Sequence, residues 1–241
     1  MMIQFKTDPG RVRSSNQDAI TAFTLEDGLF AAVCDGMGGA KGGNVASGLC
    51  ARTLAEYVQS HYHTGLSPDE AAQLLNTAMD RANGAVYEWA TDHPELTGMG
   101  TTAVAALVRA KQLILANVGD SRAVLYRADE LTQLTRDHSY VQAMVDSGKL
   151  TPEQAETHPQ KNIITRAVGI ANRVETDTFA YELEPGDMLL LCSDGLTNEL
   201  SYDAMAALIR ATPREKLADV LIDKANEHGG HDNSTVVLVE N

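Results

Sequence analysis

The chain has 241 residues, of which 44% are hydrophobic and 22% charged, and this balance excludes a disordered or fibrous protein. A formal net charge of −14 makes nucleic acid an unfavourable partner, because most of the surface would repel its phosphates. The longest apolar runs, such as residues 29–34 and 102–108, are far shorter than the roughly 18 residues of a membrane span, so we expect no membrane partner.

The first thirteen residues contain Asp-Pro-Gly at positions 8–10, where a signal peptide would have its apolar run. We therefore expect a cytoplasmic protein. The three cysteines, at positions 34, 50 and 192, are an odd number and lack Cys-x-x-Cys spacing. Two of them lie in apolar runs, which predicts reduced, buried thiols and no disulfide.

Short apolar runs bounded mostly by Gly, Asp or Asn predict the strands of the fold. In chain order they are residues 19–25, 29–34, 101–108, 112–118, 122–127, 175–183, 188–192 and 235–239. No Pro-, Ser- or Gly-rich linker and no internal repeat separates them. We therefore expect residues 1–241 to form a single domain.

Three segments begin with Ser or Thr, continue with Pro and have Glu or Gln three residues after the hydroxyl, which is the capping box of a helix start. They are residues 67–70, 151–154 and 212–215. After the first start, three- and four-residue spacing predicts one buried helix face of Leu74, Leu75, Ala78, Ala82, Val86 and Trp89. Similar faces lie within residues 45–58 and 217–225. Helix pairs early and late favour an α+β fold in which helices face a sandwich of sheets.

Residues 139–162 separate two strand-rich regions and include the second of these helix starts. Such a length is unusual for a connection inside a compact domain. The segment is a candidate for a mobile flap, and an ordinary surface excursion is the alternative.

Four aspartates lie at the ends of predicted strands. Asp35 and Asp194 each follow an apolar run and precede glycine, Asp120 closes a run, and Asp232 opens the last strand. Each one alone is typical of a turn. Four carboxylates gathered at one rim would repel one another unless hard cations such as Mg²⁺ or Mn²⁺ neutralised them.

Gly36 follows Asp35 and would let the backbone approach such an ion, so we expect its carbonyl to be a ligand. Two ions roughly 3.5–4 Å apart could hold a bridging hydroxide for in-line attack on phosphorus. The pattern is therefore compatible with an acidic phosphohydrolase. His228 and His231 suggest zinc as an alternative, but neither paired cysteines nor a His-x-x-x-His helix accompanies them.

Six ordered motifs that span nearly the whole chain resemble those of the metal-dependent Ser/Thr protein phosphatases of the type-2C (PPM) family, in its compact bacterial form. They are residues 8–18 (DPGRVRSSNQD), 35–39 (DGMGG), 98–102 (GMGTT), 117–122 (NVGDSR), 193–195 (SDG) and 232–234 (DNS). The resemblance implies a four-layer αββα fold, in which a central antiparallel β-sandwich is flanked by helices on both faces. It also implies a metal centre where the strand ends meet.

The same resemblance implies two tightly bound Mg²⁺ or Mn²⁺ ions bridged by Asp35. The carbonyl of Gly36 would bind one ion, and Asp194 and Asp232 would bind the other. Asp18 would act through metal-bound water, as both a metal-site and a catalytic residue.

A third, weaker ion is a feature of bacterial relatives, and Asp120 and Asp194 would contribute to it here. Arg13 matches the arginine that grips the substrate phosphate. A planar guanidinium suits this role, because it can form two parallel charge-assisted bonds to phosphate oxygens.

Two departures from the family pattern concern the general acid. Relatives carry a histidine at the position of Met37 or of Ala40, and this chain has none at either. Metal-bound water, His63 and His138 are the remaining candidates for donating the proton. The variable flap near residues 139–162 is our candidate for substrate selection.

The function we expect is hydrolysis of phosphoserine and phosphothreonine in proteins by attack of a metal-bridging hydroxide. The expected partners are phosphorylated proteins, among them a Ser/Thr protein kinase, and the expected state is a monomer. One alternative is a catalytically silent phosphoprotein- or ion-binding module of the same fold, although no metal aspartate is lost. A metal-dependent phosphohydrolase acting on small molecules or nucleic acid is another, although the net charge of −14 argues against nucleic acid.

Overall fold

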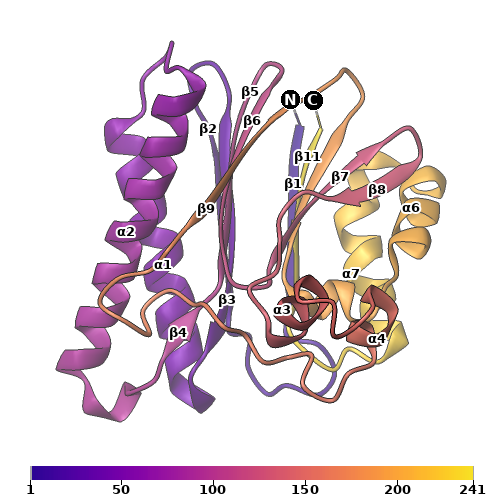
Figure 1. Ribbon diagram of the computed structural model, residues 1–241. Coiled ribbons are helices and arrows are strands. Elements are labelled where there is room, and N and C mark those ends of the chain that lie inside the picture. The colour runs from indigo at the N-terminus through magenta and orange to yellow at the C-terminus, as the bar shows by residue number, and fades with distance from the viewer. Residues whose placement is uncertain (1, 241) are drawn as a thin grey trace.

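The computed structural model describes residues 2–240, apart from the side chains of residues 40 and 41. Two antiparallel sheets lie face to face, and helices cover the outer side of each (Figure 1). Helices α1 (Gly39–His61) and α2 (Pro68–Asp92) cover one sheet, and α6 (Tyr202–Ala211) and α7 (Leu217–His228) cover the other. This arrangement is the predicted α+β fold with four αββα layers.

The sheet beside α6 and α7 has the strand order β1-β11-β10-β7-β8, and the sheet beside α1 and α2 has the order β2-β3-β5-β6-β9, with β4 paired to β3. The first sheet consists of β1 (Met2–Asp8), β11 (Ser234–Glu240), β10 (Met188–Cys192), β7 (Arg122–Arg127) and β8 (Glu130–Gln133). The second consists of β2 (Asp18–Thr24), β3 (Leu29–Met37), β4 (Gly100–Thr101), β5 (Ala103–Arg109), β6 (Gln112–Val118) and β9 (Asp177–Glu182).

Shorter helices occupy the connections. They are the 3₁₀ turn η1 (Pro94–Leu96), α3 (Tyr140–Asp146), α4 (Pro152–Glu156), α5 (Asp194–Thr197) and the 3₁₀ turn η2 (Arg214–Lys216). Of these, α3 and α4 lie within the predicted flap.

Strand β3 is buried on both of its faces, which explains its uninterrupted apolar run. Residues 30, 32 and 34 pack with α1 and α2, while residues 29, 31 and 33 pack in the core between the two sheets. Alternate side chains of a strand point to opposite faces, so a strand inside a layered fold needs apolar residues throughout. Asp35, the carboxylate of this strand, comes directly after the apolar run.

All the predicted strands are present, although the run at residues 101–108 is divided into β4 and β5. The sequence pattern misses β1 and β8, which are the two edge strands of the first sheet. Their side chains are partly or fully exposed, so neither strand has the apolar composition by which the buried strands were predicted.

Two of the three predicted helix starts are confirmed, because Ser67 and Thr151 each form a complete capping box. The third prediction is wrong. Thr212 is the C-terminal cap of α6, the turn η2 follows, and α7 begins at Leu217 without a side-chain cap. The predicted apolar face of α2 is buried up to Val86, but Trp89 is 42% exposed.

The three cysteines are free and buried, as predicted. Within residues 2–240, no helix combines the length and the apolar character that crossing a membrane requires.

Candidate active site

The ends of several strands bring five aspartates to one end of the sandwich. Asp18 and Asp35 face each other in the register of β2 and β3. Asp194 is the first residue of α5, directly after β10, and Asp120 and Asp232 lie in the loops after β6 and before β11. All except Asp18 line a cavity of about 440 Å³, together with Arg13, Ser14, Ser15, Gln17, Gly36, Met37, Gly38, Gly39, Thr102, Asn162, Ile164 and Asn233.

Asp18 is held by two hydroxyl groups from the opposite sheet. Its Oδ2 accepts hydrogen bonds from Ser193 Oγ at 2.8 Å and from Thr235 Oγ1 at 2.6 Å. Its Oδ1 is buried and has no hydrogen-bond partner in the structure. A buried carboxylate oxygen without a partner is costly, so this atom indicates a missing water or cation.

The carboxylates raise one another's pKa. Burial raises the pKa of Asp35 well above its usual value, and the charges of Asp18, Asp194, Asp120 and Asp232 raise it further. These effects show that the other four groups lie within electrostatic reach of Asp35. Without a neutralising charge, the ionised cluster opposes its own burial.

The pKa values of three neighbouring aspartates are raised as well, each to a different extent. Burial raises the pKa of Asp18 to about 6, against its two hydrogen bonds. Burial, followed by the charge of Asp194, raises the pKa of Asp120 to about 7. Burial and then the charge of Asp232 raise the pKa of Asp194, although Arg122 and Asn198 act in the opposite direction.

This donor set fits a hard divalent cation such as Mg²⁺ or Mn²⁺. The side-chain oxygens are carboxylates, the preferred ligands of these ions, and Asp18 Oδ1 has unused acceptor capacity. In the part of the chain that the structure describes, no three His, Cys, Asp or Glu side chains form a ready-made cluster around one point. Backbone carbonyls, such as that of Gly36, and water are further oxygen donors that such an ion could take.

Gly36 lines the cavity directly after Asp35. Its N–H donates to the carbonyl of Gln17 at 3.1 Å, and Asp35 is fixed by a hydrogen bond from its own N–H to Thr102 Oγ1 at 2.9 Å. The Thr102 N–H donates back to the Asp35 carbonyl at 2.8 Å. The backbone of the strand end is thus rigidly placed beside the carboxylates.

Among the described residues that line the cavity, Arg13 carries the one positively charged side chain. Its Nη2 donates to Asp232 Oδ2 at 2.8 Å, and its side chain is 54% exposed. The guanidinium therefore lies where it can reach an anion entering from solvent, although its present partner is one of the carboxylates.

Sequence reasoning assigned no role to Asn233, which organises the loop that carries Arg13. Its Oδ1 accepts from the N–H of Gln17 at 2.8 Å, and its Nδ2 donates to the carbonyls of Pro9 and Ser15 at 2.9 and 3.0 Å. Asn233 lies in the quoted motif at residues 232–234, but its partners are more than 200 residues away in the chain.

Neither histidine suggested as a general acid lines the cavity. His63 follows the end of α1 that lies away from the cavity, and the 23 residues of this helix make it about 35 Å long. The Nδ1 of His138 accepts the N–H of Gly119 at 3.0 Å. Met37 does line the cavity, while the side chain at position 40 lies outside the described residues.

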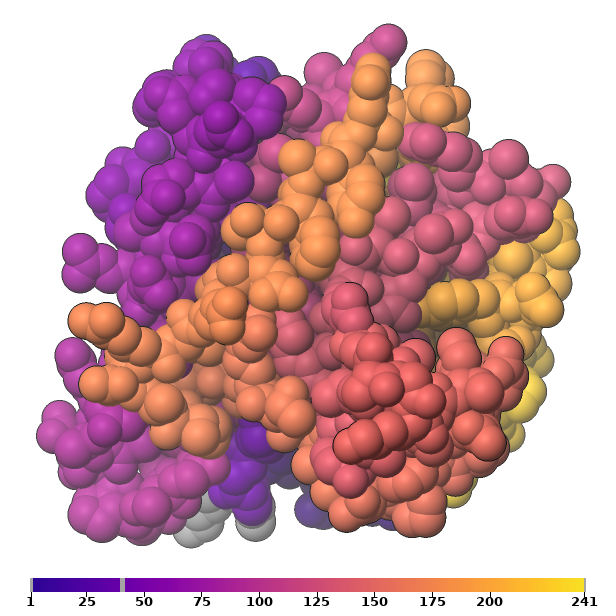
Figure 2. All heavy atoms as spheres, viewed as in Figure 1, coloured from indigo at the N-terminus to yellow at the C-terminus, as the bar shows by residue number. Residues whose placement is uncertain are grey.

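The predicted flap lies next to this cavity. Figure 2 shows the segment as a compact knob at the lower right of the viewed face. A bridge between Ser139 and Ile164 closes its base, and Asn162 and Ile164 line the cavity. The flap is therefore placed to contact whatever binds there.

The sequence matches the family model described as protein phosphatase 2C over residues 10–221. The chain belongs to the protein phosphatase 2C family. A relative in this family, the serine/threonine phosphatase stp of Listeria innocua, is 42% identical over 100% of this chain and 96% of that protein. Protein phosphatase PhpP of Streptococcus pneumoniae is 37% identical over 99% of this chain and 97% of the length of PhpP.

Solved structures of the family share the fold. Stp1 from Staphylococcus aureus has a TM-score of 0.92 and 37% identity, with 99% of this chain and 95% of that chain covered. The catalytic domain of the phosphatase PstP in complex with two manganese ions has a TM-score of 0.85 and 35% identity, with 98% and 96% covered.

Proposed function

We propose that this chain is a Mg²⁺- or Mn²⁺-dependent phosphoprotein phosphatase that hydrolyses phosphoserine and phosphothreonine. The observation that carries the proposal is the buried set of carboxylates beside an open cavity, with an oxygen of Asp18 left without a partner. Membership of the protein phosphatase 2C family supports the reaction class.

In this proposal Asp35 would help to hold two ions, the carbonyl of Gly36 would bind one of them, and Asp194 and Asp232 would bind the other. Asp120 and Asp194 would contribute to a third, weaker ion. Ions held in this way would lower the pKa of water to give a nucleophile at neutral pH, and would neutralise charge on the phosphoryl oxygens.

The role proposed for Asp18 is to orient water at the site. Ser193 and Thr235 hold one of its oxygens, which fixes the carboxylate and leaves Oδ1 to accept a hydrogen bond. Arg13 would bind the substrate phosphate, exchanging its bond to Asp232 for bonds to phosphate oxygens. Because no histidine is among the described cavity residues, the leaving alcohol would take its proton from water.

The substrates are phosphorylated proteins, which include a Ser/Thr protein kinase, and the chain acts as a cytoplasmic monomer of one domain. The flap at residues 139–162 contributes to substrate selection, which its position at the cavity supports.

The test is phosphate release from a phosphothreonine peptide with Mn²⁺ and with EDTA, for the wild type and for Asp35→Asn, Asp194→Asn and Asp92→Asn. Asp92 is an exposed residue at the end of α2 and provides a matched control. We expect activity only with the metal, a loss of at least about a hundredfold in the two cavity variants, and no change in the control.

Phosphate release in EDTA at the wild-type rate would contradict the proposal. Binding of the peptide with Mn²⁺ but without phosphate release would favour the silent binding module instead. Turnover of a small aryl phosphate with none of the peptide would favour a small-molecule phosphohydrolase.

A further inference from the structure

Two adjacent residues hold both ends of the loop that carries Asp120. Arg122 donates to Asp137 through Nε, at 3.1 Å to each carboxylate oxygen, and through Nη2, at 2.7 Å to Oδ2. On the other side of Asp120, the N–H of Gly119 donates to His138 Nδ1 at 3.0 Å, and the His138 N–H donates to the Gly119 carbonyl at 2.9 Å. The position of Asp120 therefore depends on residues 137 and 138.

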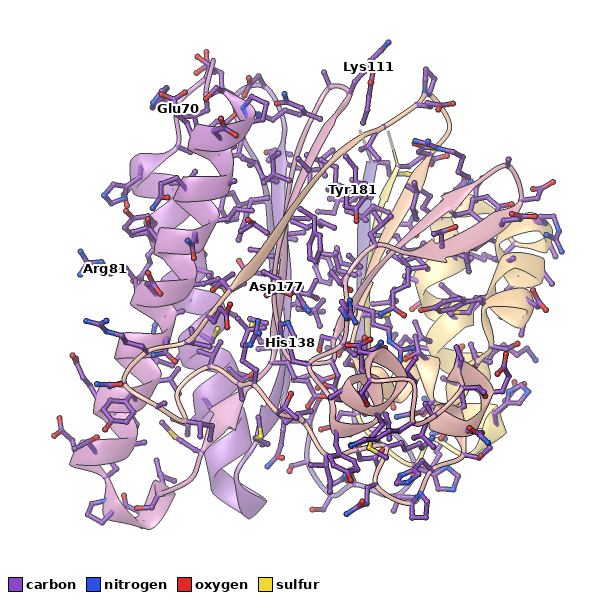
Figure 3. All side chains as sticks on the ribbon, in the orientation of Figure 1. Glu70, Arg81, Lys111, His138, Asp177 and Tyr181 are labelled. Carbon is purple, nitrogen blue, oxygen red and sulfur yellow. The ribbon has the colours of Figure 1, made fainter. Side chains whose placement is uncertain are left out.

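The imidazole of His138 is fixed in one orientation. Because Nδ1 accepts a hydrogen bond from a backbone N–H, we assign the ring proton to Nε2, which lies 3.1 Å from Asp177 Oδ2 and 3.0 Å from Arg166 Nη1. The ring is only 7% exposed, and Figure 3 shows His138 and Asp177 close together. A carboxylate on the second nitrogen of a histidine is a common device for holding the ring in a single tautomer.

The surroundings of Asp177 keep its carboxylate in the ionised form that accepts the hydrogen bond from His138. Its burial acts to raise its pKa, but hydrogen bonds from Arg166 and His138 outweigh that effect and leave the pKa below its usual value. Arg166 Nη1 donates to Asp177 Oδ1 at 2.6 Å. Asp177 begins β9, so the ring of His138 is anchored to the sheet.

The same histidine also forms the base of the flap. Its carbonyl accepts the N–H of Thr165 at 2.7 Å, and the adjacent Ser139 forms the bridge to Ile164. The N–H of Tyr140 donates to the carbonyl of Ile163 at 2.7 Å. His138 thus contacts the Asp120 loop with its ring and its backbone N–H, and the returning stem of the flap with its carbonyl.

We propose that His138 is a positioning residue that couples the base of the flap to the placement of Asp120. A phosphoprotein that engages the flap would then strengthen divalent-ion binding at Asp120, and the ion would strengthen phosphoprotein binding by the same factor. This inference rests on the proposed function. Its alternative is that His138, Asp137 and Asp177 only stabilise the fold.

The first measurement is a calorimetric Mn²⁺ titration of the metal-free protein, alone and with a saturating peptide that carries a non-hydrolysable phosphonate analogue of phosphothreonine. In the wild type we expect the peptide to tighten the weakest Mn²⁺ site. Asp120→Asn should remove that site and leave the tighter ones.

His138→Leu removes the polar contacts of the ring with Gly119, Asp177 and Arg166. It should weaken the weakest site by about tenfold to a hundredfold and abolish the effect of the peptide. His138→Asn keeps an acceptor for the Gly119 N–H and should recover most of the Mn²⁺ affinity. His63→Asn, at an exposed histidine far from the cavity, is the matched control and should behave as the wild type.

Imidazole nitrogen NMR of the metal-free protein provides a second readout, in which we expect His138 with its proton on Nε2. An Nδ1-protonated ring, or a His138→Leu variant with wild-type thermal stability, Mn²⁺ titration and peptide effect, would overturn the inference. The proposed function fails separately, if the wild type with Mn²⁺ releases no phosphate from the phosphothreonine peptide.

Discussion

At Gly36 the chain passes so close to the start of α1 that no side chain fits. A Cβ atom added there would lie 2.0 Å from the carbonyl oxygen of Gly43 and 2.7 Å from that of Gln17. Both obstacles are backbone atoms, so a side chain could be accommodated only by moving the strand end or the helix. The missing side chain is what allows the backbone after Asp35 to lie against α1 and the cavity.

We therefore expect Gly36→Ala to lower the free energy of unfolding by about 1–3 kcal/mol and to reduce phosphatase activity. Gly48→Ala is the matched control, because Gly48 is exposed within α1 and its added Cβ would meet no atom within 4 Å. This control should instead gain about 0.5–1 kcal/mol from the lower chain entropy of alanine. Urea unfolding of both variants checks the prediction, and equal effects of the two substitutions would contradict it.

The residues of the site differ in how far the sequence could predict them. Asp35 and Asp194 could be predicted because each follows an uninterrupted apolar strand and precedes glycine. The two hydroxyls that hold Asp18 could not, because Ser193 and Thr235 are 175 and 217 residues away and meet it only across the two sheets. The burial of His138 against Asp177 is equally a product of the tertiary fold.

At the scale of elements, residues 67–70 and 212–215 share a capping pattern but form different structures. Ser67 accepts the N–H of Glu70 at 3.2 Å, and the Glu70 carboxylate accepts the N–H of Ser67 at 2.8 Å. At Thr212 the preceding residues already form α6, and the Thr212 N–H donates to the carbonyl of Leu208. A local pattern cannot show that a residue is needed to end the previous helix, and for this reason the prediction at Thr212 was wrong.

Because only Ser67 caps the start of a helix, substitutions at Ser67 and Thr212 should differ in their effect on stability. We expect Ser67→Ala to cost about 1 kcal/mol of stability, because α2 loses its N-terminal cap. Thr212→Ala should change the stability by less than about 0.5 kcal/mol, since the structure gives it no capping role at α7. Thermal unfolding of both variants at neutral pH measures this, and a larger loss in Thr212→Ala than in Ser67→Ala would contradict it.

At the scale of the whole molecule, the fold buries like charges together in a chain that is already acidic. The net charge is −14, and Asp18, Asp35, Asp120 and Asp194 all have raised pKa values in the absence of metal. Packing of the two sheets places these groups at one end of the sandwich, where burial disfavours their ionised forms. Binding of cations and of protons should therefore compete at this end of the molecule.

The sign of the resulting pH dependence follows from the raised pKa values. An unfolded aspartate titrates near 3.8, whereas Asp18 and Asp120 in the folded protein titrate near 6 and 7, so the folded state holds more protons between about pH 4 and pH 7. Stability then falls as the pH rises through this window. Asp177 and Asp187, whose pKa values are lowered, have given their full contribution by about pH 5 and do not obscure the effect.

From Asp18 and Asp120 alone we therefore expect the metal-free protein in EDTA to lose about 4 kcal/mol between pH 5 and pH 8, seen as a fall of roughly 8–16 °C in Tm. Saturating Mn²⁺ should raise the Tm more at pH 8 than at pH 5.5, because its carboxylate ligands must be deprotonated. Asp35→Asn removes one member of the cluster, so its Tm in EDTA should vary less with pH. A Tm in EDTA that rises from pH 5 to pH 8 would show that the carboxylates are not charge-coupled in the folded protein.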